Sequence, residues 1–180
     1  VKGFTRILAE KAAKKYPEYN LTPERINIIV AASALHDIGK ITIKDSVLLK
    51  PGRLDKDEFE YMKSHTVRGC DILDQIDGAW DSEYAKVSYA ICRHHHERYD
   101  GKGYPDGLVG NEIPIYARIV AVADSYDAMN SRRIYRSALS AEMIEEELRK
   151  NRGTQFDPEI TDLFLRLLKE GKVEVEEERL

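Results

Sequence analysis

Histidines and aspartates gather at four points along this chain, and their types and order are those of metal ligands. His36 is followed by Asp37, His65 comes next, a run of three histidines occupies positions 94–96, and Asp124 follows. Imidazole and carboxylate together suit a borderline divalent ion such as manganese or iron, and the lack of cysteine ligands argues against a structural zinc site. The sequence therefore predicts a centre that holds metal ions.

Each of these residues has an ordinary structural explanation when it is taken alone. A single His65 is more often a helix-surface or core histidine, and a single Asp124 among valines and alanines would need a buried hydrogen-bond partner. The complete set favours ligation. Two ions about 4 Å apart would acidify a shared water and clamp the oxygens of an in-line phosphoryl displacement. We expect Asp37 to bridge the two ions, with His36 and Asp124 on one and His65, His95 and His96 on the other.

Helices are expected to position these residues, because apolar residues recur at helical spacing and no strand alternation occurs. A helix over 1–16 precedes a second one that Thr22 caps and that should end near Gly39, with His36 and Asp37 in its last turn. The fold class is therefore an all-α bundle with an irregular loop over 101–107. Further helices are predicted from the Asp55 and Glu58 capping box through His65 to Leu73, from Ser82 to the triple histidine, over 115–129, after Ser140 and after Asp157.

The composition excludes several other classes of protein. The 180 residues suit one domain, and 28 basic against 32 acidic residues give a net charge of -4, which offers no patch for gripping a long nucleic acid. Cys70 and Cys92 lack CxxC spacing and are expected to be buried thiols. No apolar run is long enough to span a bilayer and no signal-peptide pattern opens the chain. We therefore expect a cytoplasmic protein that contacts neither DNA nor a membrane.

Several short motifs, taken in order, carry a resemblance to a known family. They are His36-Asp37-Ile38-Gly39-Lys40, Leu49-Lys50-Pro51-Gly52, Met62-Lys63-Ser64-His65, His95-His96-Glu97, Asp100-Gly101-Lys102-Gly103-Tyr104-Pro105, Ala117-Arg118-Ile119, Val122-Ala123-Asp124 and Tyr135-Arg136. The set resembles the signatures of HD-GYP domains up to about Leu168. This resemblance implies the helical bundle of the HD superfamily and the activity of a cyclic di-GMP phosphodiesterase.

The resemblance also implies a ligand set and a departure from it. Members hold two or three divalent ions, often iron or manganese, so we expect two ions and leave a third open. The family supplies a further ligand histidine from its first helix, whereas this chain has no histidine before His36. The best register places that histidine just upstream of Val1, and we expect the sequence to be a fragment cut after it. The matching ligands are His36, Asp37, His65, His95, His96 and Asp124, with His94 outside the pattern.

Substrate contacts are implied at four further positions. Lys40 is expected to bring its ammonium group to a phosphate near the ions. Arg133 and Arg136 are expected to meet phosphate oxygens or the face of a guanine base, because guanidinium forks suit both. Lys40 is also assigned a catalytic role beside Asp37, although a lysine at the end of a helix is equally explained by the helix dipole. Tyr104 could stack on a guanine or pack in the core, and both explanations stay open.

Two acidic residues are expected to contact the ligand side chains and orient them without binding the metal themselves. Glu97 follows the ligand histidines, and Asp127 lies one turn after Asp124, where it could orient a ligand or be a plain carboxylate. By resemblance, the loop over 101–107 shapes the site and docks diguanylate cyclase partners.

The predicted reaction is hydrolysis of cyclic di-GMP to linear pGpG, and on to GMP, by a hydroxide that the two ions share. We assign 1–168 to the HD-GYP domain and 169–180 to a charged tail, with a sensory or receiver domain upstream in the full-length protein. Two alternatives stay open. One is a non-catalytic module that binds a cyclic dinucleotide or docks a cyclase, and the other is an HD phosphohydrolase of another cyclic dinucleotide or nucleotide.

Overall fold

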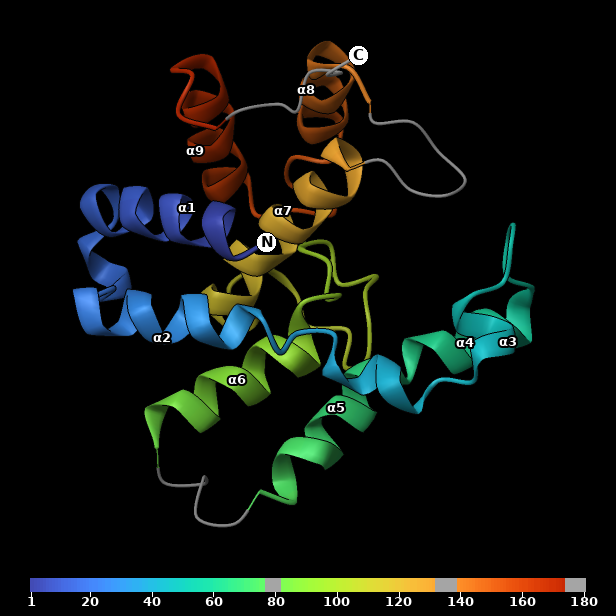
Figure 1. The fold of residues 1–180 in the computed structure, drawn as a ribbon. Coiled ribbons are helices and arrows are strands. Elements are labelled where there is room, and N and C mark those ends of the chain that lie inside the picture. Colours follow the sequence, from blue (N-terminus) through green and yellow to red (C-terminus); the bar gives the residue numbers. More distant parts are fainter. Residues whose placement is uncertain (77–81, 132–138, 174–180) are drawn as a thin grey trace.

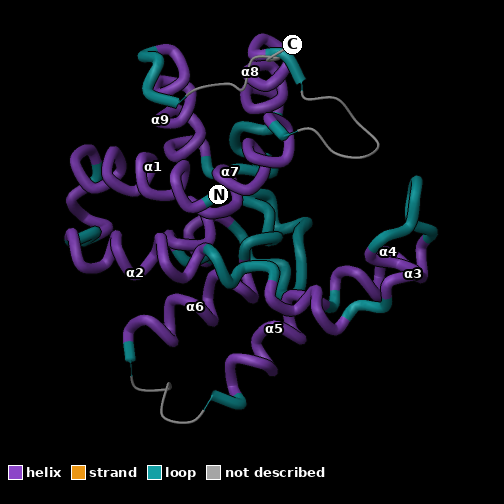
Figure 2. The backbone as a smooth tube through the Cα atoms, in the orientation of Figure 1, coloured by secondary structure: helices purple, strands orange, loops and turns teal. Residues whose placement is uncertain are grey.

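Helices form the framework of this protein, as the apolar periodicity predicts. The computed structural model describes residues 1–76, 82–131 and 139–173 (Figure 1). Within these ranges β-structure is limited to the isolated bridges Asp100–Val109 and Arg152–Phe156 (Figure 2). The elements are α1 (Lys2–Lys15), η1 (Pro17–Tyr19), α2 (Pro23–Ser33), η2 (Ile38–Thr42), α3 (Asp45–Leu48), α4 (Lys56–Lys63), α5 (His65–Asp74), α6 (Glu83–His94), η3 (Gly110–Glu112), α7 (Ile115–Asn130), α8 (Ala141–Lys150) and α9 (Pro158–Lys169).

The hydrophobic core lies where α1, α2, α6, α7 and α9 meet. Helix α1 packs on α2, α7 and α9, and α6 packs on α2 and α7. Each fully buried Leu, Ile or Phe side chain contributes about 1.5–3 kcal/mol through removal from water. These contacts fix α6, which leads into His95 and His96, relative to α7, which carries Asp124. Core side chains with no exposed surface include Leu8, Ile29, Ile91, Ile119 and Phe164.

The helix starts follow the capping signals in the sequence. Thr22 Oγ1 accepts from the amide of Arg25 at 3.2 Å, so α2 begins where it was predicted. The capping box is also present, since Asp55 accepts from the Glu58 amide at 2.8 Å and Glu58 accepts from the Asp55 amide at 2.9 Å. These side chains satisfy amide groups that a helix start leaves without partners.

The predicted end of the second helix was wrong. Helix α2 stops at Ser33 instead of continuing to Gly39, so His36 and Asp37 lie in a turn between α2 and η2. The Ser33 carbonyl accepts from His36 Nδ1 at 2.6 Å, and the Ser33 hydroxyl bonds to the carbonyl of Val30 at 2.6 Å. Such side-chain bonds compete with the helical pattern. The tighter turn then brings Gly39 against α5.

The helix expected around His65 is divided in two. Helix α4 ends at Lys63 and α5 begins at His65, with Ser64 between them. The hydroxyl of Ser64 donates to the carbonyl of Tyr61 at 2.5 Å, and the Ser64 amide donates to the same carbonyl at 3.1 Å, three residues back instead of four. His65 therefore lies at the start of a helix and not inside one. Helices α3 and α4 project from one side of the bundle (Figure 1).

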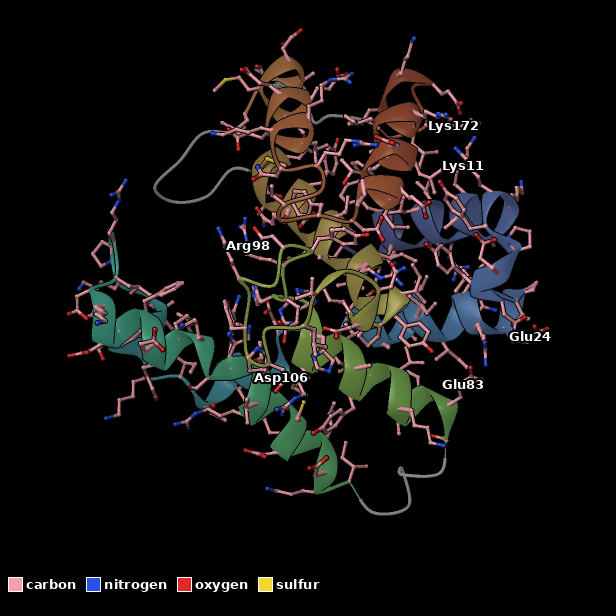
Figure 3. All side chains as sticks on the ribbon, turned by 180° about the vertical axis from the view of Figure 1, so that it is seen from behind. Lys11, Glu24, Glu83, Arg98, Asp106 and Lys172 are labelled. Carbon is pink, nitrogen blue, oxygen red and sulfur yellow. The ribbon has the colours of Figure 1, made fainter. Side chains whose placement is uncertain are left out.

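The remaining fold predictions concern the cysteines and the end of the chain. Cys70 and Cys92 are free and buried, as expected. After α9, Glu170 pairs with Lys172 at 2.8 Å and lies 3.5 Å from Lys11, and Figure 3 shows both lysines near the α1–α9 contact. Val173 is buried in the core. None of the described helices combines the length and apolarity needed to cross a membrane.

Candidate metal centre

Four separate elements deliver the predicted ligands to one place. The turn after α2 supplies His36 and Asp37, and the start of α5 supplies His65. The turn after α6 supplies His95 and His96, and the middle of α7 supplies Asp124. A Cβ atom on Gly39 would overlap the carbonyl oxygen of His65, so only glycine allows this close approach of η2 to α5.

The ligand atoms fall into two groups that share one carboxylate. Asp37 Oδ1 lies 3.3 Å from His65 Nε2 and 3.5 Å from His95 Nε2. Its other oxygen, Oδ2, lies 3.2 Å from His36 Nε2, and that nitrogen is 3.3 Å from Asp124 Oδ1. Ligand atoms within each group lie within 4.8 Å of one another, and the division is the one predicted from the sequence. The groups are Asp37, His65, His95 and His96, and His36, Asp37 and Asp124.

Backbone carbonyls orient three of the imidazoles. Nδ1 of His36 meets the carbonyl of Ser33 at 2.6 Å, and Nδ1 of His65 meets the carbonyl of Met62 at 2.7 Å. His95 Nδ1 lies 3.0 Å from the carbonyls of residues 91 and 92. A proton on Nδ1 in these contacts leaves a lone pair on Nε2, which is the usual arrangement of a histidine ligand.

The inward-facing atoms lack hydrogen-bond partners. Within the described part of the chain, the buried Nε2 atoms of His36, His65 and His95 and Oδ1 of Asp37 make no hydrogen bond, and their nearest charged neighbours belong to the same cluster. A buried polar atom without a partner costs about 1–3 kcal/mol. Nitrogen and oxygen donors that converge in this way fit divalent cations, which would satisfy all of these atoms at once.

The charges around the cluster shift several pKa values. Burial, with the neighbouring His95 and His65 imidazoles, lowers the pKa of His96 to about 3. Burial also lowers the pKa of His95, so both rings are neutral near pH 7, as ligation requires. Burial disfavours a charged His36, but the carboxylates of Asp124 and Asp37 outweigh it and raise its pKa to about 10.

The shared carboxylate stays ionised. Burial alone would raise the pKa of Asp37, but the imidazoles of His36, His65 and His95 lower it well below its usual range. Burial acts on Asp124 in the same direction, and His36 overcomes it, so the pKa of Asp124 is also lowered. The cluster therefore presents two anionic oxygen donors beside the neutral imidazoles of His95 and His96.

Lys40 lies at this cluster, as predicted. Its Nζ is 2.8 Å from Asp37 Oδ2. Both residues line a cavity of about 290 Å³, whose wall also includes His95, His96 and Asp124. A cation in the wall of this cavity can meet a phosphate that enters it.

Glu97 supports a loop and not the ligand imidazoles. Its carboxylate accepts from the backbone amides of Asp106 at 2.8 Å and Leu108 at 3.1 Å. The side chain has no exposed surface. Figure 3 shows Asp106 on the loop between α6 and α7, the segment that carries the Gly-Tyr-Pro signature. Glu97 therefore fixes the position of that loop over the histidines.

Tyr104 lies on this loop and contacts a predicted ligand histidine. Its ring stacks on His96 with centroids 5.0 Å apart and an angle of 18°. The ammonium of Lys63 lies over the ring at 5.5 Å from its centroid. Burial raises the pKa of Tyr104, so its hydroxyl stays protonated. The ring orients His96, and a contact with substrate stays a prediction.

The other predicted residues lie outside the cluster. His94 Nδ1 lies 3.6 Å from Glu97 Oε1 and 3.5 Å from Asp106 Oδ2. Asp127 does not belong to either group of possible ligand residues in the described part of the chain. Arg133 and Arg136 lie outside the described residues, so their expected substrate contacts stay predictions.

Three polar residues of the cavity wall were missed from the sequence. Arg98, Ser125 and Gln155 line it with the predicted ligands. Ser125 could have been found from its place beside Asp124. Gln155 carries no local signal, because the loop before α9 reaches the site by pairing with the loop after α6, through the Tyr99 amide and the Gln155 carbonyl at 3.2 Å.

Fold and site together define a helical metal-binding domain with two linked His/Asp groups. The HD domain family matches residues 3–160, so the chain belongs to this family. The family implies divalent-metal binding, and the two groups could hold the ions. The HD-GYP recognition and the all-α fold class are confirmed.

Curated relatives and one solved structure agree with this assignment. The chain is 45% identical over 175 residues to the cyclic di-GMP phosphodiesterase response regulator RpfG of Xanthomonas campestris, covering 97% of this chain and 44% of that protein. It is 40% identical over 147 residues to 3'3'-cGAMP-specific phosphodiesterase 2 of Vibrio cholerae, covering 82% of this chain and 27% of that protein. The chain thus spans less than half the length of these relatives.

The solved structure is a cyclic GMP-AMP specific phosphodiesterase of Vibrio cholerae. It superposes with a TM-score of 0.61 at 16% identity, covering 93% of this chain and 43% of the other. At this identity the likeness shows the shared fold.

Proposed function

We propose that this chain hydrolyses a phosphodiester bond of a cyclic dinucleotide, with cyclic di-GMP as its substrate. The observation that carries the proposal is the set of three buried imidazole nitrogens that face Asp37 without a hydrogen-bond partner. Support for the substrate class comes from the relatives, which are named cyclic di-GMP and 3'3'-cGAMP phosphodiesterases.

The metal content proposed for the site is two divalent ions, iron or manganese, with a third left open. The two groups that share Asp37 would hold them. Bound divalent ions polarise phosphoryl oxygens and acidify water, which is the chemistry that phosphodiester hydrolysis needs.

The chain's own residues would bind and orient the phosphodiester. Lys40 would offset its negative charge, because its ammonium lies 2.8 Å from Asp37 at the cavity. Arg133 and Arg136 are proposed as further contacts to phosphate or base on sequence grounds alone. Tyr104 would hold His96 in place through its stacked ring.

The test is turnover by the full-length protein loaded with manganese or iron. We expect cyclic di-GMP to give linear pGpG and then GMP. Chromatography of the reaction mixture would detect both products. Asp37→Ala should lose both metal and turnover, because Asp37 belongs to both groups. Failure of the metal-loaded wild type to cleave any cyclic dinucleotide would leave the non-catalytic binding module as the better account.

A second candidate substrate is 3'3'-cGAMP. The relative from Vibrio cholerae that is 40% identical over 147 residues is named for that substrate. Kinetics with both dinucleotides, mixed in one reaction, would rank them by kcat/KM, and a higher value for 3'3'-cGAMP would replace cyclic di-GMP as the assigned substrate.

The proposed domain boundaries and partners rest on the sequence and on the relatives. We propose that 1–168 act as the domain with 169–180 as a charged tail, joined in a cytoplasmic protein to a sensory or receiver domain. The name of the Xanthomonas relative, a response regulator, supports such a partner domain. Diguanylate cyclase domains are proposed to dock on the loop that carries Tyr104. Pull-down of a purified cyclase domain, with and without that loop mutated, would test this contact.

A further inference from the structure

A second cavity opens beside the metal centre. Its volume is about 320 Å³, and it shares three wall residues with the metal cavity, namely Ser125, Ala128 and Gln155. Each cavity alone is at the small end of ligand sites, which run from about 300 to 1,000 Å³. Two adjoining spaces of similar size suit a ligand that has two parts.

Helix α7 forms the floor between the two cavities. Asp124 and Ser125 border the metal cavity, and Met129, one turn further on, borders only the second one. Ala128 lines both cavities, as Ser125 does. The boundary is therefore built from small side chains on a helix that the core holds in place.

The opposite wall comes from α8 and the loop before α9. Glu147 and Asn151 lie one helical turn apart, and Gln155 follows. The amide of Asp100 donates to the carbonyl of Thr154 at 2.8 Å, which ties this wall to the loop that follows the ligand histidines. The two cavities thus have a fixed relationship.

Glu147 gives the second cavity a prearranged acceptor. Asn151 Nδ2 donates to the Glu147 carbonyl at 2.9 Å and approaches its Oε2 at 3.4 Å. In the described part of the chain no other hydrogen bond reaches this carboxylate. Met129 and Phe156 supply apolar surface on the same cavity. A flat ring with hydrogen-bond donors along one edge fits such a lining.

We propose that this cavity is a nucleobase subsite that selects guanine, an inference that rests on the proposed function. Guanine presents N1–H and a 2-amino group side by side, and both can donate to the Glu147 carboxylate. Adenine has no donor at N1, where its lone pair would face the carboxylate. A site built around such a hydrogen-bonded pair rejects an analogue that cannot form it.

The test compares Glu147→Gln with a matched control, Glu146→Gln, on the same helix. Glu146 is exposed and does not line the cavity. Glutamine keeps the size of Glu147 and can still accept from Asn151, but it loses one acceptor and the charge. Three substrates are used with manganese-loaded full-length protein: cyclic di-GMP, cyclic di-AMP and bis(p-nitrophenyl) phosphate, which has no base.

We expect E147Q to lower kcat/KM for cyclic di-GMP by about tenfold or more, mainly through KM, and to lower the preference for cyclic di-GMP over cyclic di-AMP. Hydrolysis of bis(p-nitrophenyl) phosphate should stay within about twofold of wild type, which shows an intact metal centre. E146Q should behave as wild type with all three substrates.

Two outcomes would count against the inference, and they are distinct. An E147Q protein with wild-type preference between the two dinucleotides would refute the guanine subsite and leave the phosphodiesterase assignment standing. A wild-type protein that cleaves bis(p-nitrophenyl) phosphate but neither dinucleotide would refute the proposed substrate class and the subsite with it.

Discussion

The α-carbon of Gly39 lies directly against the backbone of His65, so that a Cβ at Gly39 would overlap the His65 carbonyl oxygen and come within 2.6 Å of the Gly69 amide nitrogen. This contact joins η2, which follows Asp37, to α5, which begins with His65. The distance between two ligands from different elements is therefore set by a position that has no side chain.

Gly39→Ala should damage fold and site together. Backbone atoms cannot move aside as a flexible side chain can, so we expect unfolding free energy to fall by about 3 kcal/mol, the upper end for overpacking. Metal content after purification should fall as well, because η2 must separate from α5. Denaturant unfolding and elemental analysis would measure both effects.

The control for that variant is Gly3→Ala. Nothing lies within 4 Å of a Cβ at Gly3 on helix α1, so alanine there should stabilise by about 0–1 kcal/mol. Equal unfolding free energies of the two variants would show that the close η2–α5 contact does not determine the stability of the fold.

Asp37 and Asp124 should differ in how much metal they control. Asp37 belongs to both ligand groups, and Asp124 belongs to one. We expect Asp37→Asn to lower the binding affinity for both ions by more than about 100-fold. Asp124→Asn should lower the affinity for one ion and leave the affinity for the other unchanged. Titration calorimetry with manganese would count the sites that remain. Loss of the same number of sites in both variants would contradict a shared carboxylate.

Metal loading should stabilise the protein. The buried nitrogen and oxygen atoms without partners destabilise the metal-free fold, and an ion that binds only the folded chain shifts the equilibrium. At a free concentration of about 100 times Kd, manganese should add about 2.7 kcal/mol of stability and raise Tm by about 5–10 °C. Thermal unfolding with added manganese and with a chelator would show this. An unchanged Tm in the Asp37→Ala protein is the control.

The sequence predicts the ligand set because its information is chemical and local. The residue types at His36, His65 and Asp124 restrict which metal can bind. The caps at Thr22 and Asp157 mark where helices begin, because capping acts within a few residues. The end of α2 could not be predicted from periodicity. It depends on the Ser33 carbonyl, which the His36 ring takes as a partner.

Contacts between distant segments account for the rest of what sequence reasoning missed. Glu97 was expected behind the histidines, yet its partners are loop amides nine and eleven residues further on. Gln155 reaches the cavity because two loops pair across the fold. Neither contact has a periodic or capping signal, so only the folded chain reveals it.

Glu97→Gln should release the loop that carries Tyr104. The carboxylate accepts two amides in a fully buried place, and an amide side chain would turn one NH₂ group toward an N–H donor. A buried donor without a partner costs about 1–3 kcal/mol, so the loop should open more often. Hydrogen exchange at the Asp106 and Leu108 amides should accelerate, and the Tyr104 ring should lose its fixed stacking on His96.

Glu112→Gln is the matched control for that loop. Glu112 also accepts a loop amide, from Val109 at 2.9 Å, but it is exposed, so water can replace the lost acceptor. We expect its exchange rates at Asp106 and Leu108 to equal those of wild type. If Glu97→Gln left those rates unchanged too, the loop would be held by other contacts, and the bidentate pairing of Arg93 with Asp106, at 2.8 Å for both bonds, would be the next to remove.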